Sequence, residues 1–446
     1  MTTKFTSRRF FWSVFIALLV ACGTLPPEST PTATQATTHT GKATLAPSLT
    51  PVSPTPTILP TTSTPTSSFP VSSASDGLRM AYVVDGNIYF QNGSNPPLQL
   101  TNSGEDWRLV FFTDDGEKIF FFRGVTGQDL YSINVDGSEE QVLVTSNLLL
   151  TFGSEYDEST TLCDLILVPH IHHLLFRTCS HPDENTIVYQ SDLFLVDANN
   201  NQVKNLFPRE QGGTVYVSPD GSMLAIDRHN YIDIVGIDGK MIYPKLATYT
   251  LSEPVPLASH VYWISDSREL IVALPINTYH ETGLIPKYAI WRYSLDTGTG
   301  VQISFDPPPM GHDPARVSPD GNRIIYNDYE EGLFYVGNLR EGQAQLYEPS
   351  GAYVFSDWNL ASTHFIYENA AGRDLYVGSF NSPPVLIGRG RFIGWIDANR
   401  YLYSIDKSLV VGDIGGESKP ILMGTAQSSF SYYPEGFIFR YQPLQN

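Results

Sequence analysis

The sequence has few cysteines and few basic residues, and each shortage excludes a class of protein. Its 446 residues include only 3 cysteines, so it is not a small scaffold built on disulfides. The 46 acidic residues outnumber the 27 basic ones, which gives a net charge of -19. Because affinity for nucleic acid comes mostly from neutralising phosphates, this charge argues against nucleic-acid partners and against electrostatic adhesion to anionic lipid.

Sequence motifs of the common enzyme classes are missing as well. The chain contains no Gly-x-Ser-x-Gly nucleophile elbow, no Walker loop, no dinucleotide fingerprint and no His-Glu-x-x-His motif. We therefore predict no catalytic residue and no cofactor. This favours a binding protein over an enzyme but does not decide between them.

The N-terminal apolar run, residues 10–20, is too short to cross a bilayer, which takes about 20 residues. It follows a positively charged start and ends at Leu19-Val20-Ala21-Cys22, an order typical of a secretory signal, which we assign to residues 1–21. The last four residues resemble the bacterial lipobox. That resemblance implies that Cys22 becomes the first mature residue and carries lipid. The alternative is an ordinary signal peptide with an incidental cysteine.

These features predict a lipoprotein on the extracytoplasmic face of a bacterial membrane, in contact with the membrane through its lipid alone. Ser7-Arg8-Arg9-Phe10-Phe11 also resembles a twin-arginine export signal, although we favour general secretion. Residues 22–76 are rich in Thr, Pro and Ser and poor in large apolar residues. Such a segment cannot offset its ordering entropy, so we predict a disordered linker.

Residues 77–446 show short β-type runs separated by tight turns, and no long helical period. The sequence Ser-Pro-Asp-Gly stands between two such runs at Ser218 and at Ser318, and weaker copies occur elsewhere. A second phrase of the type Asp-Leu-Tyr follows, and a closing strand ends each unit. The second phrase occurs near residues 87, 129, 192, 231, 289, 332, 374 and 408.

Four strands in each unit of about 40–50 residues are typical of a β-propeller blade. The pattern resembles the repeat of TolB-type propellers, which prolyl-oligopeptidase propellers share. We predict an all-β fold of eight four-stranded blades, with seven as the alternative. The first unit starts in mid-blade near Met80, and the last phrase, residues 430–441, has no successor. The two chain ends therefore complete one blade.

Two cysteines remain in the body of the chain, Cys163 and Cys179. A hairpin folded about Ile171 would set them opposite each other, and we predict a disulfide between them in an oxidising compartment. Two buried free thiols are the alternative.

Candidate site residues are few. On a strand, His170 and His172 would share a face, which makes them weak metal candidates, but such a pair more often lines a hydrated hairpin, so we predict no metal. Two loops interrupt the spacing of the blades, and insertions on propellers often bind ligands. Their candidate contacts are Tyr279, His280, Met310 and His312. Tolerated surface insertions are the alternative.

The fold and the anchor together predict a monomeric, non-catalytic binding or scaffold module for a protein or an envelope glycan. The alternative is an extracytoplasmic hydrolase, lyase or cofactor-dependent dehydrogenase with its site in the propeller channel. Many activities use this scaffold, so the fold does not select among them.

Overall fold

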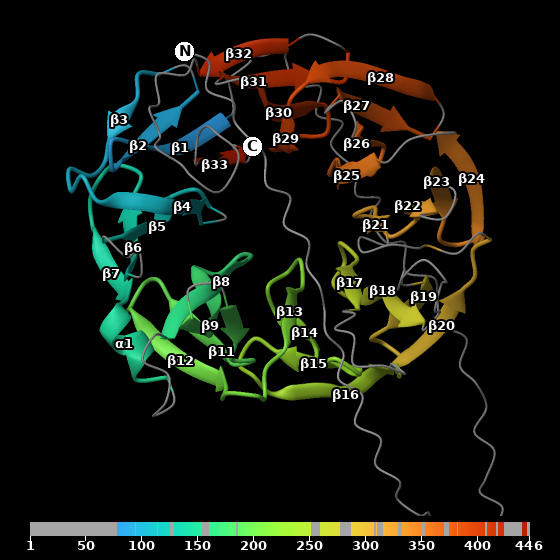
Figure 1. The fold of residues 1–446 in the computed structure, drawn as a ribbon, viewed down its shortest axis with the longest axis horizontal. Helices are drawn as coiled ribbons and strands as arrows, with labels where there is room; N and C mark the ends of the chain where they lie inside the picture. Colours follow the sequence, from blue (N-terminus) through green and yellow to red (C-terminus); the bar gives the residue numbers. More distant parts are fainter. Residues whose placement is uncertain are drawn as a thin grey trace, which may run out of the picture. The chain divides into compact units, whose positions relative to one another are not determined.

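In the computed structural model, eight β-sheets follow one another around a ring (Figure 1). All described residues belong to one compact unit, Ser68–Asn446. The described ranges are 78–93, 95–113, 115–124, 129–153, 160–183, 186–250, 259–276, 287–306, 309, 315–328, 332–348, 353–369, 374–380, 382–405, 408–415, 418–422 and 439–443.

The first four blades are antiparallel sheets that follow in sequence order. Blade 1 consists of β33 (Phe439–Pro443), β1 (Leu78–Val84), β2 (Asn87–Asn92) and β3 (Leu98–Gln99). Blade 2 consists of β4 (Asp106–Phe112), β5 (Lys118–Arg123), β6 (Asp129–Asn134) and β7 (Gln141–Val144), and the short helix α1 (Ser146–Leu150) follows it. Blade 3 consists of β8 (Thr160–Val168), β9 (His173–Asp183), β10 (Thr186–Tyr189), β11 (Leu193–Asp197) and β12 (Gln202–Phe207). Blade 4 consists of β13 (Thr214–Val217), β14 (Met223–Asp227), β15 (Tyr231–Gly236) and β16 (Met241–Thr248).

The remaining four blades repeat the same order of strands. Blade 5 consists of β17 (His260–Trp263), β18 (Glu269–Ile276), β19 (Lys287–Ser294) and β20 (Thr299–Ile303). Blade 6 consists of β21 (Arg316–Val317), β22 (Arg323–Asp328), β23 (Leu333–Asn338) and β24 (Gln343–Glu348). Blade 7 consists of β25 (Tyr353–Trp358), β26 (His364–Asn369), β27 (Asp374–Ser379) and β28 (Ser382–Arg389). Blade 8 consists of β29 (Arg391–Trp395), β30 (Arg400–Ile405), β31 (Ser408–Asp413) and β32 (Ser418–Leu422).

The predicted eight-bladed propeller is therefore confirmed, and seven blades are excluded. The third strand of each blade begins within two residues of the eight second phrases found in the sequence. Blade 3 has a fifth strand because its third strand is broken. Both β10 and β11 pair with β9, at Cys179 and at Phe176 respectively, while β8 pairs with β9 along its length.

The ring is closed by the two ends of the described chain. β1 pairs antiparallel with β33, with Met80 opposite Tyr441. The C-terminal part of the chain thus supplies a strand of blade 1, and the pairing of β33 with β1 holds the ring closed. The expectation that the chain ends share one blade is confirmed.

Apolar side chains form eight buried clusters, one between each pair of neighbouring blades. The second strands are buried on both faces, which explains runs such as Ile119-Phe120-Phe121-Phe122 that lack polar alternation. One cluster joins Met80 of blade 1 to Leu402 of blade 8 and so completes the ring. The core therefore lies between neighbouring blades all around the ring.

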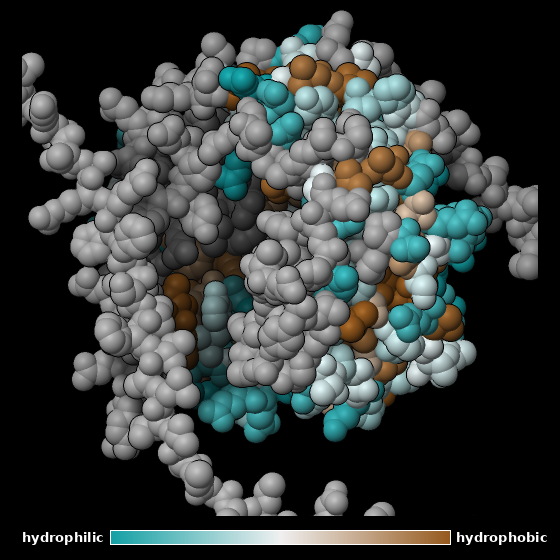
Figure 2. All heavy atoms as spheres, turned by 45° about the vertical axis from the view of Figure 1, so that its right-hand side comes forward, coloured by the Kyte–Doolittle hydropathy of each residue, from teal (hydrophilic) through white to brown (hydrophobic). Residues whose placement is uncertain are grey.

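The outer strands, by contrast, carry isolated apolar side chains. Val301 on β20, Leu346 on β24 and Leu386 on β28 are all exposed. In Figure 2 the apolar side chains on the described part of this face lie in separate patches among hydrophilic ones. Scattered exposure of this kind is normal for a protein surface and marks no docking face.

None of the described helices is long and apolar enough to span a membrane.

Candidate functional site

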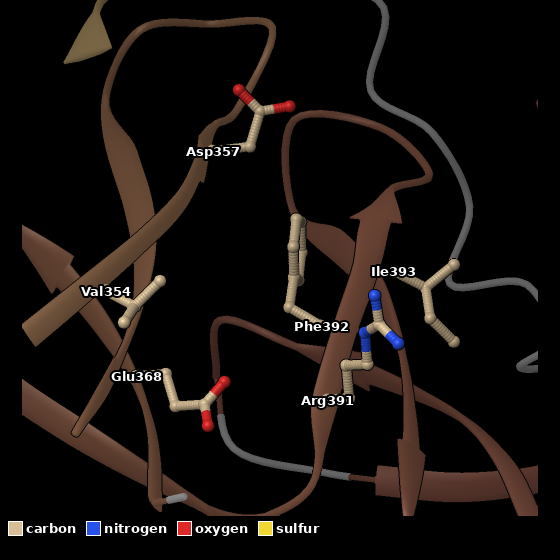
Figure 3. A pocket seen from close by; sticks show the side chains of 6 residues that line it. All are labelled: Val354, Asp357, Glu368, Arg391, Phe392 and Ile393. Atoms are coloured by element: carbon tan, nitrogen blue, oxygen red, sulfur yellow. The ribbon is translucent and has the colours of Figure 1, made fainter. Parts of the chain in front are cut away.

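A pocket of about 350 Å³ opens between blades 7 and 8, at their innermost strands (Figure 3). Two of the strands that line it, β25 and β29, are the first strands of their blades and contact each other. The lining residues are Val354, Asp357, Glu368, Arg391, Phe392 and Ile393. The set combines two carboxyl groups, one guanidinium group and one aromatic ring.

A β-bulge on β25 brings Asp357 into the pocket. Phe355 pairs with Tyr367 and Asp357 pairs with Ile366, so one extra residue stands between them. Regular alternation would place residues 354 and 357 on opposite faces of the strand. The bulge resets the alternation. Val354 and Asp357 are consequently exposed, while the intervening Phe355 is 4% exposed.

The opposite wall has a bulge of its own. On β29, Phe392 pairs with Tyr403 and Gly394 pairs with Leu402, which leaves Ile393 as the extra residue. As a result Arg391, Phe392 and Ile393 all reach the pocket. Bulges are over-represented next to functional sites because they redirect side chains out of the regular pattern.

Two charged side chains in the pocket have no partner among the residues that the structure describes. Among the described residues, neither Glu368 nor Arg391 takes part in a hydrogen bond or an ion pair. Other arginines of the propeller form ion pairs. Arg123 pairs with Asp106 at 2.6 Å, and Arg228 pairs with Asp233 at 2.7 Å. The two uncommitted charges are therefore available to a ligand.

The carboxyl group of Asp357 is the third charged group of the pocket. Burial raises its pKa, because the surrounding wall removes much of its hydration although the group still touches solvent. The backbone N–H of Trp358 donates to Oδ1 at 2.8 Å, and the charge of Arg316 also favours ionisation, but neither offsets the burial. Asp357 is thus held in an environment that favours its neutral form.

Tryptophan side chains fix the walls of the pocket to the neighbouring blades. The indole Nε1 of Trp358 donates to the backbone oxygen of Arg316 in blade 6, at 3.1 Å. The indole of Trp395 donates in the same way to Asp357 in blade 7, at 3.3 Å. Trp263 makes the equivalent bond from blade 5 to Tyr216 in blade 4. Trp263 and Trp395 therefore hold neighbouring blades together.

The weak metal candidates His170 and His172 lie in the β8–β9 turn, so the argument from a shared strand face was wrong. Nε2 of His172 lies 2.5 Å from Oδ2 of Asp115 in the turn between β4 and β5, and Nδ1 lies 3.3 Å from Oδ1 of Asn199. Burial opposes ionisation of Asp115, but hydrogen bonds from Thr113, from the backbone of Glu117 and from His172 outweigh it and lower its pKa. His172 therefore links blades 2 and 3.

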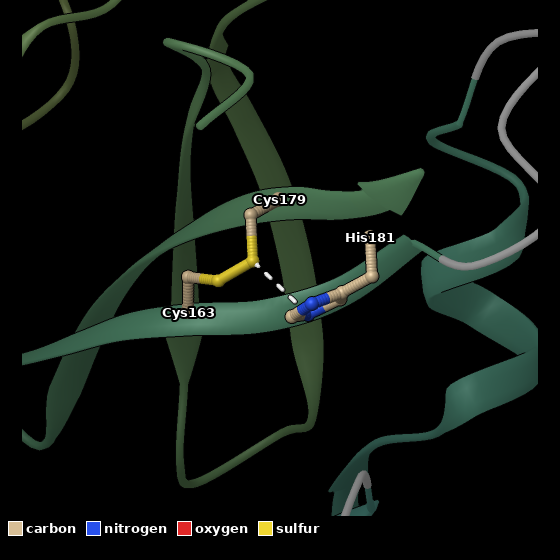
Figure 4. Close-up of side chains that lie close together, drawn as sticks. All are labelled: Cys163, Cys179 and His181. Atoms are coloured by element: carbon tan, nitrogen blue, oxygen red, sulfur yellow. Dashed lines mark hydrogen bonds between the residues drawn. A yellow bond between two sulfur atoms is a disulfide. The ribbon is translucent and has the colours of Figure 1, made fainter. Parts of the chain in front are cut away.

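In blade 3, a disulfide joins Cys163 on β8 to Cys179 on β9, with Cα atoms 5.8 Å apart. The turn of this hairpin spans residues 169–172, close to the predicted centre at Ile171. The cysteines are not directly opposite, because Cys163 is the extra residue of a bulge and Cys179 pairs with Thr161. The imidazole of His181 lies beside the two sulfur atoms (Figure 4).

The other predicted site residues lie outside the described residues. These are the lipidation candidate Cys22 and the loop candidates Tyr279, His280, Met310 and His312. The pocket residues of blades 7 and 8 were not predicted. A charged residue directly before the tryptophan of an inner strand, Asp357-Trp358, is the one sequence signal that could have indicated them.

Comparison with known proteins supports the fold and leaves the activity open. No protein-family profile matches the chain, and no curated protein matches it either. A solved structure of a eukaryotic initiation factor is similar, with a TM-score of 0.52 and 14% identity over 77% of this chain and 83% of that one. At this identity the likeness shows the fold alone.

Two other solved structures are similar at lower scores. The dihydro-heme d1 dehydrogenase NirN has a TM-score of 0.48 and 14% identity, over 79% of this chain and 75% of that one. TolB from Acinetobacter baumannii has a TM-score of 0.31 and 14% identity, over 60% of this chain and 62% of that one. A propeller scaffold by itself does not separate catalysis from binding.

Proposed function

We propose that this protein is a lipid-anchored, extracytoplasmic binding module that takes an envelope glycan into the pocket between blades 7 and 8. One observation carries the proposal: Glu368 and Arg391 line a pocket and have no partner among the described residues. Glu368 is half-buried, and half-buried charges are normally paired because leaving them unpaired costs free energy, whereas Arg391 is exposed at the mouth of the pocket. Sites that bind ligands tolerate this cost because the ligand supplies the missing partner.

The chemistry of the pocket suits a sugar. A carboxylate accepts hydrogen bonds from hydroxyl groups, and a guanidinium group donates several in a fixed geometry. The ring of Phe392 offers an apolar face beside these polar groups, and a few polar groups in a small pocket are the usual composition of a ligand site. The acidic chain as a whole favours a neutral or cationic partner over a polyanion.

The location rests on the sequence of the first residues. The charged start, the short apolar run and Leu19-Val20-Ala21-Cys22 support export and attachment through Cys22. Residues 22–76 would then hold the propeller away from the membrane surface.

A second candidate is hydrolysis of the glycan. The raised pKa of Asp357 near a second carboxyl group, that of Glu368, is the observation that favours it, since glycoside hydrolysis uses an acid and a carboxylate in different environments. We favour binding because the chain carries none of the common catalytic sequence motifs.

The test is isothermal titration calorimetry of the full chain with oligomers of N-acetylglucosamine. We expect saturable binding that falls at least about tenfold in Glu368→Gln and in Arg391→Ala, because each variant removes a charge-assisted hydrogen bond. Arg389→Ala is the matched control. Arg389 lies two residues away, its side chain is 77% exposed, and it pairs with Asp374 on the surface.

Three outcomes would count against the proposal. Equal affinity in Arg391→Ala and Arg389→Ala would place the ligand elsewhere. Binding of a peptide partner in place of any sugar would change the ligand class. Release of shorter oligomers during the titration would favour the hydrolytic alternative, and Asp357→Asn would then abolish it.

A further inference from the structure

Three atoms of the kind that bind zinc gather in blade 3. They are Sγ of Cys163, Sγ of Cys179 and Nε2 of His181, and all lie within 4.8 Å of one another. Figure 4 shows the imidazole pointing at the two sulfur atoms. In this structure the sulfur atoms are joined as a disulfide, so neither is present as the thiolate that a metal binds.

Strand geometry explains why the three groups meet. Cys179 and His181 are two residues apart on β9, so their side chains lie on one face of the strand. Cys163 comes from the neighbouring strand β8, where it is the extra residue between the pairs Leu162–Thr178 and Asp164–Arg177. The bulge frees its backbone from the regular ladder and lets its side chain adjust.

The spacing already fits a tetrahedral metal on the side of β9. Sγ of Cys179 lies 3.8 Å from Nε2 of His181. Zinc bonds of about 2.3 Å to sulfur and about 2.1 Å to nitrogen place two tetrahedral ligands roughly 3.6 Å apart. Oγ1 of Thr161 lies 3.0 Å from the same nitrogen and 3.3 Å from Sγ of Cys179, so this hydroxyl has to turn away before a metal binds.

Besides the Thr161 hydroxyl, the side chain of Cys163 has to move. Two thiolates on one zinc ion lie roughly 3.8 Å apart, against about 2.0 Å in a disulfide. Rotation of the Cys163 side chain on its bulge supplies this change, while Cys179, which is fully buried, and His181 keep their places.

We propose that the cluster Cys163, Cys179 and His181 is a redox-controlled zinc site, closed as the disulfide and opened by reduction. A dithiol reductant supplies two electrons and two protons: the bond between the two sulfur atoms breaks, two thiols form, and the reductant becomes a disulfide. Zn²⁺ then displaces both thiol protons and accepts a lone pair from the neutral imidazole. Two cysteines and one histidine leave a fourth position for water. This site is independent of the glycan pocket.

The test uses Co²⁺ as a spectroscopic probe of the full chain in detergent. All variants carry Cys22→Ser, so that Cys163 and Cys179 are the two remaining cysteines of the chain. The protein is reduced with a phosphine, the phosphine is removed, and Co²⁺ is added. We expect thiolate-to-cobalt charge-transfer absorption that saturates at one ion per chain and disappears when Zn²⁺ is added.

Variants and the oxidised protein separate this site from adventitious binding. The oxidised chain and Cys163→Ser should lack the absorption, and His181→Ala should weaken Co²⁺ binding at least about tenfold. His364→Ala, a half-buried histidine on β26 in blade 7, is the matched control and should bind as the parent does.

Two results would overturn the proposal. If His181→Ala and His364→Ala bind Co²⁺ equally, the histidine is not a ligand. If reduction alone unfolds the chain, as followed by far-ultraviolet circular dichroism, the disulfide is a structural cross-link and no metal site forms.

Discussion

The indole Nε1 of Trp395 donates a hydrogen bond to the backbone oxygen of Asp357, 3.3 Å away, and so ties blade 8 to blade 7 beside the pocket. Trp395 is 6% exposed, so its bond is shielded from water. Asp357, whose side chain is one of the ionisable groups of the pocket, is therefore held in place through its backbone. The position of the carboxyl group depends on the contact between the blades.

Trp395→Phe should weaken both stability and ligand binding. The substitution removes the donor, leaves the Asp357 carbonyl without this partner, and shortens a buried side chain, at a cost of about 1–3 kcal/mol. Urea unfolding measures the loss, and calorimetry measures the affinity for the sugar. Trp291→Phe is the control, since Trp291 is only half-buried and lies in the third strand of blade 5. An equal loss of affinity in both variants would contradict the positioning role.

Asp357→Asn should stabilise the protein at neutral pH. The pKa of Asp357 is raised in the folded state, so its charged form costs stability once the pH exceeds that raised value. Asparagine avoids this cost and keeps an oxygen to accept from the N–H of Trp358. The gain should stay below about 1 kcal/mol because the carboxylate touches solvent.

The pH dependence of the stability difference between Asp357→Asn and the parent protein tests this explanation. The advantage of Asp357→Asn should shrink as the pH falls through the raised pKa and vanish below the ordinary value of 3.8. Thermal unfolding midpoints of both proteins across the acid range measure it. A variant that is less stable at neutral pH would show that the carboxylate is stabilising instead.

His172→Ala should remove a pH-dependent link between blades 2 and 3. The pKa of Asp115 is lowered in the folded state, so the interaction stabilises above the ordinary pKa of Asp115 and is lost as the pH falls through the lowered value. Both side chains are partly exposed, so the loss should be at most about 1 kcal/mol at neutral pH. Asp115→Asn should give a shallower acid limb in thermal unfolding, and an unchanged limb would refute the link.

Gly86→Ala should destabilise the blade that closes the ring. Gly86 has φ +72°, and an added Cβ would come within 2.2 Å of the backbone oxygen of Gly104. Gly332 has φ +66° with open space around it, so Gly332→Ala isolates the cost of the backbone conformation, about 1–2 kcal/mol. Urea unfolding should show a clearly larger loss for Gly86→Ala. Equal losses would show that the contact with Gly104 relaxes freely.

The fold was predictable because its signals are local. The Ser-Pro-Asp-Gly turns at Ser218 and Ser318 form as expected, and in each the serine hydroxyl donates to the following aspartate at 2.6 Å. The third strands have a recognisable composition, so counting them gave the number of blades. The unmatched phrase at each chain end predicted the closure by β33.

The candidate site was not predictable because it depends on packing between distant segments. A bulge such as that at Ile393 changes which side chains share a face, and no turn residue marks it. The bond from His172 to Asp115 joins residues that are far apart in the chain. Residues 170–172 belong to a turn, where the alternation of a strand does not apply.

The central claim is that the pocket between blades 7 and 8 binds a sugar through Glu368 and Arg391. A crystal structure of the chain grown with N-acetylglucosamine oligomers tests it most directly. The account predicts a sugar ring against Phe392, with hydroxyl groups within hydrogen-bond distance of Glu368 and Arg391. A sugar bound at another blade, or only water in this pocket at a saturating concentration, would contradict it.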